Sequence, residues 1–269
     1  MRMRSMSDIE KAALFLQQRF GDKSRIAIVL GSGWSEAAEL FGKTLDEVAY
    51  SEIPGFSNSH IAGHAHKARL IELDNGHHLI AFVGRTHLYE GFGVDAVVFG
   101  IKVLAQMGIQ TLILTNACGG LNPAWKPGTP VLISDHINFT GTTPLRGANF
   151  LDVTEVYSKR LRNICTAIKP DLDEGVYVGF MGPAYETPAE IEMVRRWGGS
   201  LVGMSTVLEA MAAREANMEV LGVSLVTNLA AGMSGEPLSH AEVLEAGKNA
   251  TSMMGTLLAT VMKEITNAS

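Results

Sequence analysis

The sequence has few or none of the features that mark secreted, membrane and metal-binding proteins. Its 269 residues include two cysteines, Cys118 and Cys165, which form neither a disulfide framework nor a metal-ligand spacing. No apolar run approaches the roughly 18 residues that cross a bilayer. Two arginines lie within residues 1–5, but no apolar signal core follows them. We therefore expect a cytoplasmic protein in a reducing compartment.

An excess of positive charge is also missing. The formal net charge is −6 and the isoelectric point is near 5.8, which argues against nucleic acid as a partner because such binding needs a basic face. A small anionic substrate is compatible with this charge, since a pocket can be locally positive. The chain is 46% hydrophobic and 19% charged, which is typical of a globular protein. No linker or repeat divides it, so we predict one domain over residues 1–269, with residues 1–6 as a loose N-terminal extension.

Short apolar runs alternate with helical patterns along the chain. The runs at 26–30, 79–83, 111–114, 131–133, 177–180, 201–202 and 219–227 predict buried strands. Periodicity and capping patterns predict helices at 8–19, 34–40, 94–107 and 154–168, and after Thr187, Thr206 and Ser239. Residues 53–67, 115–120 and 140–149 are expected to be loops. The alternation predicts an α/β layered fold with a mostly parallel or mixed sheet.

Residues 84–91, which read GRTHLYEG, place ligand-type side chains directly after a predicted strand. Ligands bind at the carboxyl ends of strands in open α/β sheets. Arg85 can bind an oxyanion with a planar fork of donors, and His87 and Tyr89 would point the same way in an extended segment. Three ligand-type residues at i, i+2 and i+4 favour a binding site over a polar surface loop. Glu90 is expected to be structural.

Five histidines cluster between residues 60 and 78, namely His60, His64, His66, His77 and His78. Two histidines at i and i+2 on a strand can share one metal ion. No carboxylate or cysteine lies close enough in sequence to complete a tetrahedral set, so we expect no metal. A single loop histidine that reaches into a pocket is the favoured interpretation.

The loops that follow the strands are expected to converge, and their residues fall into three chemical groups. One group suits an oxyanion such as phosphate, and its members are Ser32, His64, Arg85, His87, Asn116 and Ser205. A second group can hold a flat heterocycle by stacking and by edge hydrogen bonds, and it consists of Tyr185, Glu186 and Asn228. The third combines apolar bulk with polar tips, which suits a sugar, and it consists of Tyr89, Met204 and His240.

Seven motifs in this order resemble the trimeric, low-molecular-mass purine nucleoside phosphorylases of the nucleoside phosphorylase superfamily. They are VLGSG at 29–33, GHA at 63–65, GRTHLYEG at 84–91, TNACGGLNP at 115–123, GPAYET at 182–187, VGMST at 202–206 and TN at 227–228. The resemblance covers roughly residues 25–255. It implies a homotrimer of single-domain α/β subunits, each built around a mixed, distorted central β-sheet flanked by helices.

The resemblance also implies an activity and a role for each matching residue. The implied reaction is that of a pentosyltransferase in purine salvage: a purine nucleoside and phosphate give ribose 1-phosphate and a free purine, reversibly and with no cofactor. Carried over by motif, the phosphate ligands are Ser32, His64, Arg85, His87, the amide of Ala117, and Ser205. Tyr89, Met204 and His240 would contact ribose, and Tyr185, Glu186 and Asn228 would contact the base.

Bond cleavage in this reaction builds negative charge on the departing purine. A donor from Asn228 to the purine N7 would stabilise that charge, as an oxyanion hole does. We count Asn228, Glu186 and His87 as catalytic. An ionised Glu186 can accept from the N1–H of a 6-oxopurine, whereas adenine offers it a lone pair. The combination of Glu186 and Asn228 therefore favours inosine and guanosine, or their deoxyribonucleosides.

Three positions depart from the family pattern. Cys118 stands where alanine or glycine is usual, and Tyr185 replaces a common phenylalanine. The loop after Arg146 is shorter than in relatives that send a phenylalanine into a neighbouring subunit, so Phe150 is not assigned.

The alternative functions are those of a related phosphorylase with methylthioadenosine or broader nucleoside specificity, a metal-dependent hydrolase that uses the histidine cluster, and a non-catalytic nucleoside-binding protein.

Overall fold

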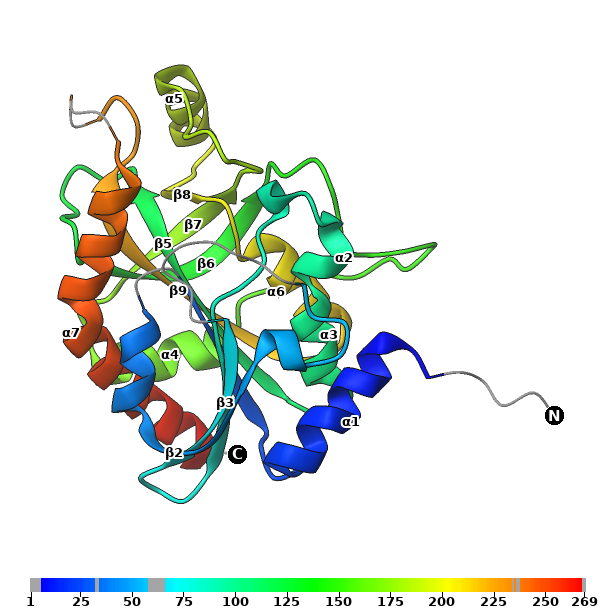
Figure 1. Ribbon diagram of the computed structural model, residues 1–269. Helices are drawn as coiled ribbons and strands as arrows, with labels where there is room; N and C mark the ends of the chain where they lie inside the picture. Colours follow the sequence, from blue (N-terminus) through cyan, green and yellow to red (C-terminus); the bar gives the residue numbers. More distant parts are fainter. Residues whose placement is uncertain (1–5, 32–33, 58–65, 234, 236–237, 268–269) are drawn as a thin grey trace.

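The computed structural model describes residues 6–31, 34–57, 66–233, 235 and 238–267. A mixed β-sheet runs through the centre, and helices cover both of its sides (Figure 1). The predicted α/β fold with a mixed central sheet is therefore confirmed. Across the described residues, no helix combines the length and the apolar character that crossing a membrane requires.

The sheet is distorted because its second half closes on itself. Its described strands are β1 (Ile26–Leu30), β2 (Gly42–Ala49), β3 (Lys67–Leu73), β4 (His78–Val83), β5 (Thr111–Gly120), β6 (Pro130–Asn138), β7 (Asp173–Gly179), β8 (Leu201–Gly203) and β9 (Glu219–Leu229). They lie in the order β2-β3-β4-β1-β5-β8-β7-β6-β9, and β9 also pairs with β5. Strands β4, β1, β5 and β9 run parallel, whereas β2–β3, β3–β4, β5–β8 and β6–β9 are antiparallel pairs.

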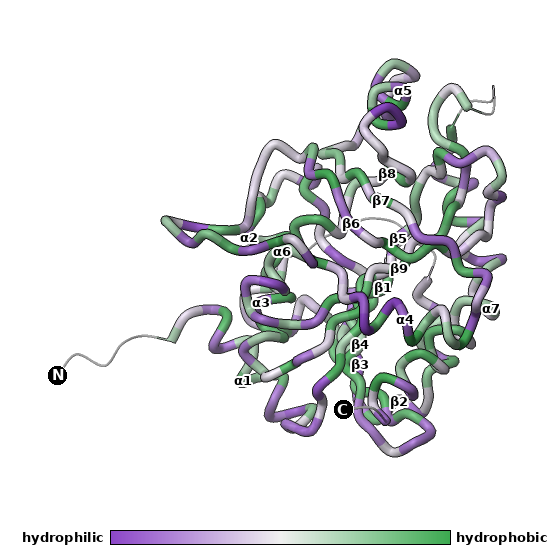
Figure 2. Tube along the Cα trace, turned by 180° about the vertical axis from the view of Figure 1, so that it is seen from behind, coloured by the Kyte–Doolittle hydropathy of each residue, from purple (hydrophilic) through white to green (hydrophobic). Residues whose placement is uncertain are grey.

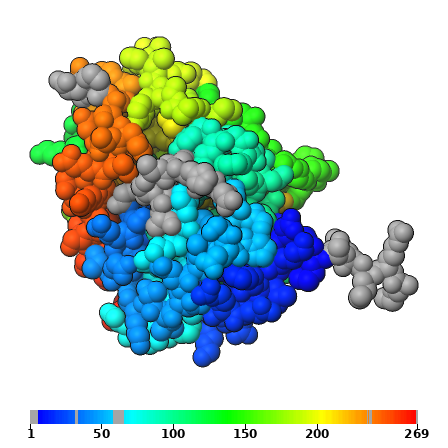
Figure 3. Space-filling view, in the orientation of Figure 1, coloured from blue at the N-terminus to red at the C-terminus, as the bar shows by residue number. Residues whose placement is uncertain are grey.

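The helices form a layer on each side of the sheet. They are α1 (Asp8–Phe20), α2 (Gly93–Val97), α3 (Phe99–Gln106), α4 (Lys159–Ile168), α5 (Pro188–Arg196), α6 (Val207–Glu215) and α7 (His240–Asn267), with short 3₁₀ segments η1 (Ser35–Leu40), η2 (Tyr50–Glu52) and η3 (Leu88–Glu90). Helix α3 packs against α1 and α6 on one side, and α7 packs against η1 and α4 on the other. In the space-filling view α7 forms one edge of the molecule (Figure 3).

Side chains of the buried strands alternate between these two layers. In β1, Ala27 and Val29 belong to the apolar cluster that includes α1 and α3, whereas Ile26, Ile28 and Leu30 belong to the cluster under α7. Successive side chains of a strand point to opposite faces, so a strand between two layers must be apolar throughout. The central strands are accordingly hydrophobic in Figure 2.

The local capping predictions are confirmed at two helices. Ser7 and Glu10 form a capping box at the start of α1. Thr187 and Glu190 do the same at α5, where Pro188 occupies the first turn. These interactions lie within four residues, which is why the sequence predicts them well.

Residues 115–120 were expected to form a loop, and that expectation is wrong. They continue β5, which pairs with β9 along its length and with β8 at Gly119 and Gly120. A Cβ at Gly119 would come within 3.0 Å of Val202, and one at Gly120 within 2.9 Å of Val226. The glycines therefore allow the neighbouring strands to approach closely.

Two predicted helices also have different bounds. The helix expected at 154–168 begins at Lys159, because Ser158 donates its backbone N–H to Val220 of β9 and caps the first turn with its side chain. The helix expected at 94–107 is divided at Val98 into α2 and α3.

Candidate active site

A cavity of about 350 Å³ lies where the ends of β4, β7, β8 and β9 meet the second half of β5. Each predicted site residue that the structure describes lines this cavity, namely Arg85, His87, Tyr89, Asn116, Ala117, Tyr185, Glu186, Met204, Ser205, Asn228 and His240. Ser32 and His64 lie outside the described residues. The expected convergence of the loops is confirmed, and the cavity has a size typical of small-molecule sites.

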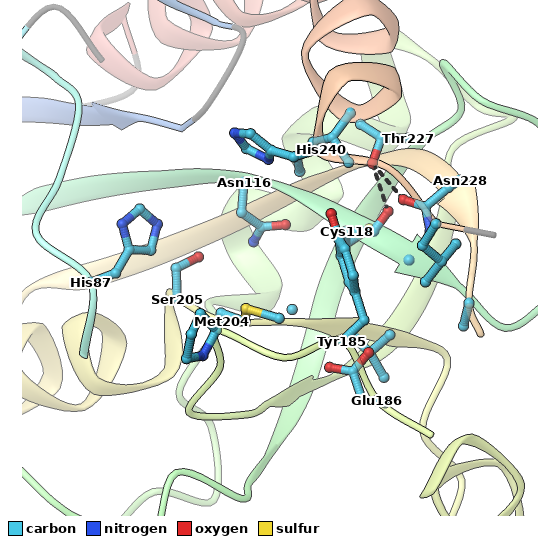
Figure 4. A pocket seen from close by; sticks show the side chains of 18 of the residues that line it. His87, Asn116, Cys118, Tyr185, Glu186, Met204, Ser205, Thr227, Asn228 and His240 are labelled. Atoms are coloured by element: carbon cyan, nitrogen blue, oxygen red, sulfur yellow. Dashed lines mark hydrogen bonds between the residues drawn. The ribbon is translucent and has the colours of Figure 1, made fainter. Parts of the chain in front are cut away.

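The three chemical groups occupy different parts of the cavity. Figure 4 shows His87 and Ser205 on one side and Glu186 and Asn228 on the other, with Met204 between them. A ligand that spans the cavity would therefore meet oxyanion-binding side chains at one end and an amide and a carboxylate at the other.

Arg85 is anchored at the oxyanion end directly after β4. Its side chain is 3% exposed, and its Nε donates to Glu209 Oε1 at 3.0 Å while its Nη1 donates to the Thr115 carbonyl at 2.7 Å. A Cβ on Gly31 would come within 3.3 Å of Arg85 Nη1 and 3.0 Å of the Asn116 backbone. Only glycine leaves the guanidinium this space.

His87 is held by its neighbours in the GRTHLYEG segment. Its backbone N–H donates to Glu90 Oε1 at 2.5 Å, and its Nδ1 lies 3.6 Å from the same oxygen. The imidazole stacks on Tyr89 with a centroid separation of 4.8 Å. Although Tyr89 belongs to the 3₁₀ turn η3 instead of an extended segment, it lines the same cavity as Arg85 and His87.

The three residues predicted to contact a sugar, Tyr89, Met204 and His240, also line the cavity. Burial and the nearby Glu90 charge raise the pKa of Tyr89 to about 12, so its hydroxyl stays protonated at neutral pH. Gly182 has φ +73°, and a Cβ there would lie 2.4 Å from Met204 Sδ and 3.0 Å from the Tyr89 ring. His240 is exposed at the start of α7.

The far end of the cavity holds a buried carboxyl group. Glu186 is 8% exposed, and its Oε1 is buried without a hydrogen-bond partner among the described residues. Burial raises the pKa of Glu186, and the charge of Glu190 adds to the effect. A buried acceptor without a partner is costly, so this oxygen is suited to a ligand that donates to it.

Asn228 is oriented by the backbone and by Thr227. Its Nδ2 donates to the Leu229 carbonyl at 2.9 Å, and its Oδ1 lies 3.0 Å from the Thr227 hydroxyl. That hydroxyl is also 3.2 Å from the Cys118 carbonyl. An amide nitrogen carries two hydrogens, so Asn228 has one left for a ligand while the other is held by Leu229.

Thr227 and Cys118 line the cavity but were not predicted as site residues. Cys118 was expected to be a buried small hydrophobe, and its side chain is buried, with its thiol donating to the Leu225 carbonyl. Burial raises the pKa of this thiol, which keeps it in the less reactive protonated form. The alternation of side chains along a strand would have placed Cys118 on the cavity side of β5 only if residues 115–120 had been recognised as part of that strand.

Within the described ranges, no group of three histidine, cysteine, aspartate or glutamate side chains is arranged to hold a metal ion. Two members of the histidine cluster, His60 and His64, fall outside those ranges.

The α/β sheet and a cavity that pairs oxyanion donors with an amide and a carboxylate define a protein of the phosphorylase type. The sequence profile of the phosphorylase superfamily matches residues 25–263. A purine nucleoside phosphorylase from a Cellulomonas species is 56% identical over 242 residues, which cover 88% of this chain and 86% of that protein. The chain therefore belongs to the phosphorylase superfamily and, within it, to the purine nucleoside phosphorylase family.

Solved structures of the same family share the fold. A Schistosoma purine nucleoside phosphorylase in complex with hypoxanthine superposes with a TM-score of 0.84 at 31% identity, covering 96% of this chain and 98% of that one. The Schistosoma mansoni enzyme in complex with adenosine gives a TM-score of 0.83 at 31% identity, covering 95% and 96%.

Proposed function

We propose that this chain catalyses the reversible phosphorolysis of purine nucleosides, in which a nucleoside and inorganic phosphate give a free purine and ribose 1-phosphate. The observation that carries the proposal is one cavity with oxyanion donors at one end and the Glu186–Asn228 pair at the other. Membership of the purine nucleoside phosphorylase family supports it.

Phosphate binds at the Arg85 end. The guanidinium, the His87 ring, the Ser205 hydroxyl and the Ala117 amide supply the described donors, and Ser32 and His64 complete the set implied by the family motifs. Ribose lies over Tyr89, Met204 and His240, which line the same cavity. A phosphate dianion next to the anomeric carbon then stabilises the positive charge that develops on the sugar.

The purine binds between Tyr185, Glu186 and Asn228. As the glycosidic bond breaks, Asn228 donates its remaining amide hydrogen to N7 and stabilises the negative charge on the leaving base. Glu186 accepts from N1–H and, in guanine, from the exocyclic amine. Because adenine has no N1–H, this pair favours the 6-oxopurines inosine and guanosine and their deoxyribonucleosides.

A broader nucleoside specificity is the second candidate. The adenosine complex of a family member with the same fold favours it, and methylthioadenosine belongs to the same group of alternative substrates. The buried acceptor on Glu186 weighs against adenine, because it would face the lone pair of N1.

We also propose the finer properties that the family resemblance implies. The chain forms a homotrimer in the cytoplasm, serves purine salvage, and requires no cofactor besides its co-substrate phosphate. Phe150 is 95% exposed in the loop before α4, which suits a side chain that meets a neighbouring subunit. Light scattering on the purified protein measures the oligomeric state.

The test of the proposed function is a steady-state panel of inosine, guanosine, adenosine and methylthioadenosine, each with and without phosphate. We expect inosine and guanosine turnover that depends absolutely on phosphate and survives exhaustive chelation. Turnover without phosphate would refute phosphorolysis, and loss of activity on chelation would favour a metal-dependent hydrolase. Binding of inosine without turnover would favour a nucleoside-binding protein.

A further inference from the structure

Glu209 lies behind the oxyanion end of the cavity without lining it. It belongs to the first turn of α6, and its side chain is 2% exposed. In the sequence it is noticeable only as the fourth residue of a capping pattern that begins at Thr206. Its contacts in the structure join two elements of the phosphate site that come from distant parts of the chain.

Each carboxylate oxygen of Glu209 holds a different element. Oε1 accepts from Arg85 Nε at 3.0 Å, and Oε2 accepts from the Thr206 backbone N–H at 2.9 Å. Arg85 Nη1 also donates to the Thr115 carbonyl. A planar guanidinium bound through two of its nitrogens has a fixed plane, so Glu209 and Thr115 together set the direction in which Arg85 presents its donors.

Thr206 occupies an unusual backbone conformation that needs such support. Its φ is +71° and its ψ is −50°, and the Val207 N–H donates to the Ser205 carbonyl at 2.8 Å. This is a γ-turn of the strained type, which a β-branched residue rarely adopts. Strained backbone persists where the surroundings hold it in place, and the bond to Glu209 is one of those constraints.

A chain of hydroxyl and amide groups runs from this turn to the cavity. Asn116 Nδ2 donates to Thr206 Oγ1 at 2.9 Å, and the Thr206 and Ser205 hydroxyl oxygens are 3.1 Å apart. The Thr206 hydroxyl accepts from Asn116 and still has its own hydrogen, which it can donate to the Ser205 oxygen. The single Ser205 hydrogen is then directed to an anion in the cavity.

We propose that Glu209 is a positioning residue that aligns Arg85 and the Ser205 hydroxyl on the same phosphate. The inference rests on the proposed function, because it takes these two groups as phosphate ligands. Glu209 touches neither the cavity nor the reacting atoms. It acts through the two groups that its carboxylate holds.

The charge of Glu209 makes the inference easy to separate from a simple electrostatic effect. A buried anion close to the site repels phosphate, so a neutral residue at 209 would tighten phosphate binding if charge alone mattered. If alignment matters more, the same neutral residue weakens binding. The direction of the change decides between the two.

The main test is Glu209→Gln, which nearly preserves the shape of the side chain. An amide has one acceptor oxygen and an NH₂ group, so it can accept from Arg85 or from Thr206 but must oppose a donor at the other. We expect the KM for phosphate to rise about 10-fold to 100-fold, the range for losing one charge-assisted hydrogen bond. The KM for inosine should change by less than about twofold, because the base end is untouched.

Glu219→Gln is the matched control. Glu219 also accepts from an arginine and a hydroxyl, Arg160 and Ser158, but lies outside the cavity at the start of β9. The KM for phosphate of the Glu219→Gln variant should stay within about twofold of that of the unmodified protein. The proposal would be overturned if Glu209→Gln lowered the melting temperature without changing the KM for phosphate. A decrease of that KM in Glu209→Gln would overturn it as well.

A double variant tests whether Glu209 acts through Arg85. If it does, Arg85→Gln with Glu209→Gln raises the phosphate KM by less than the product of the two single factors, whereas independent residues give the product. The double variant also removes both members of the buried ion pair, so it avoids leaving one charge unpaired. Multiplicative factors would refute the coupling.

Thr206→Gly provides the test if Glu209→Gln does not fold. Glycine accepts a positive φ and keeps the N–H that binds Glu209, but it removes the hydroxyl between Asn116 and Ser205. We expect a higher phosphate KM with an unchanged inosine KM, and an unchanged phosphate KM would refute the alignment of the Ser205 hydroxyl through Thr206.

Phosphate binding can also be followed without nucleoside, as the rise in melting temperature on adding inorganic phosphate. We expect Glu209→Gln to reduce this rise and Glu219→Gln to preserve it. Equal rises in Glu209→Gln and the unmodified protein would overturn the inference. Absence of inosine phosphorolysis in the unmodified protein refutes the proposed function instead, so the two failures are distinguishable.

Discussion

Replacing Asn228 with alanine tests the leaving-group chemistry most directly. In the structure one amide hydrogen of Asn228 is held by the Leu229 carbonyl, and Thr227 faces its oxygen. The amide is therefore oriented before substrate binds, which is the condition for a donor to act strongly in the transition state. A donor of this type contributes about 2.7–4 kcal/mol to lowering the barrier, or roughly 10²–10³ in kcat.

We expect Asn228→Ala to lose that factor in kcat for inosine at saturating phosphate, with a much smaller change in the KM for phosphate. Thr227→Val keeps the amide but removes the hydroxyl beside its oxygen, so kcat should fall by a smaller factor. The measurement is steady-state phosphorolysis followed by the ultraviolet change on release of hypoxanthine. An unchanged kcat in Asn228→Ala would refute the assigned role.

A second substrate identifies the atom involved. In 7-methylguanosine the methyl group occupies N7, so no donor from Asn228 can reach it, and the positive ring is a good leaving group by itself. Asn228→Ala should therefore reduce the rate with 7-methylguanosine far less than the rate with inosine. Equal losses with both substrates would show that Asn228 acts elsewhere than at N7.

Three further outcomes are expected. Asn228→Asp should relax discrimination towards adenosine, because a protonated aspartate can accept from the 6-amino group while donating to N7; guanosine preference that stays intact would contradict this. Burial raises the pKa of Glu186 above its ordinary value of 4.5, so ionisation of the carboxyl group lowers the stability of the free protein as pH rises through the folded pKa. Glu186→Gln should therefore have a higher melting temperature than the unmodified protein at pH 7, with the difference lost below about pH 4.5; a lower melting temperature at pH 7 would contradict the burial effect. Gly182→Ala should raise the KM for inosine by about tenfold or more, because its Cβ would lie 2.4 Å from Met204 Sδ and 3.0 Å from the Tyr89 ring at a φ of +73°; an unchanged KM would show that the cavity wall moves without loss.

The local sequence predicted the helices with the clearest caps and the strands with the purest apolar runs. The capping boxes at Ser7 and Thr187 depend on residues three positions apart, so no distant part of the chain has to be known. The run at 26–30 is buried on both sides, and its composition alone indicates this. Strands β2 and β3 were not predicted, because charged side chains interrupt their apolar positions and their pairing is with each other and with β4.

Errors arose where a tertiary contact overrides the local pattern. Glycines at 119 and 120 resemble a loop, yet they lie in β5 because they pair with β8 and β9, whose side chains leave no room for a Cβ. The segment before Lys159 has a helical pattern, yet Ser158 is tied to β9. In both cases the deciding partner is far away in the sequence.

The sequence by itself determined the α/β class, the family and the set of polar residues that meet in one cavity, because those residues directly follow apolar strands and form ordered motifs. Only the tertiary structure decided how the set is held. Glu209 lies 124 positions from Arg85, and no local pattern relates them. The buried carboxylate between Arg85 and Thr206, and the strained turn it supports, exist because the fold brings Arg85, which follows β4, to Thr115 of β5 and to the first turn of α6. The alignment of the phosphate donors follows from these contacts.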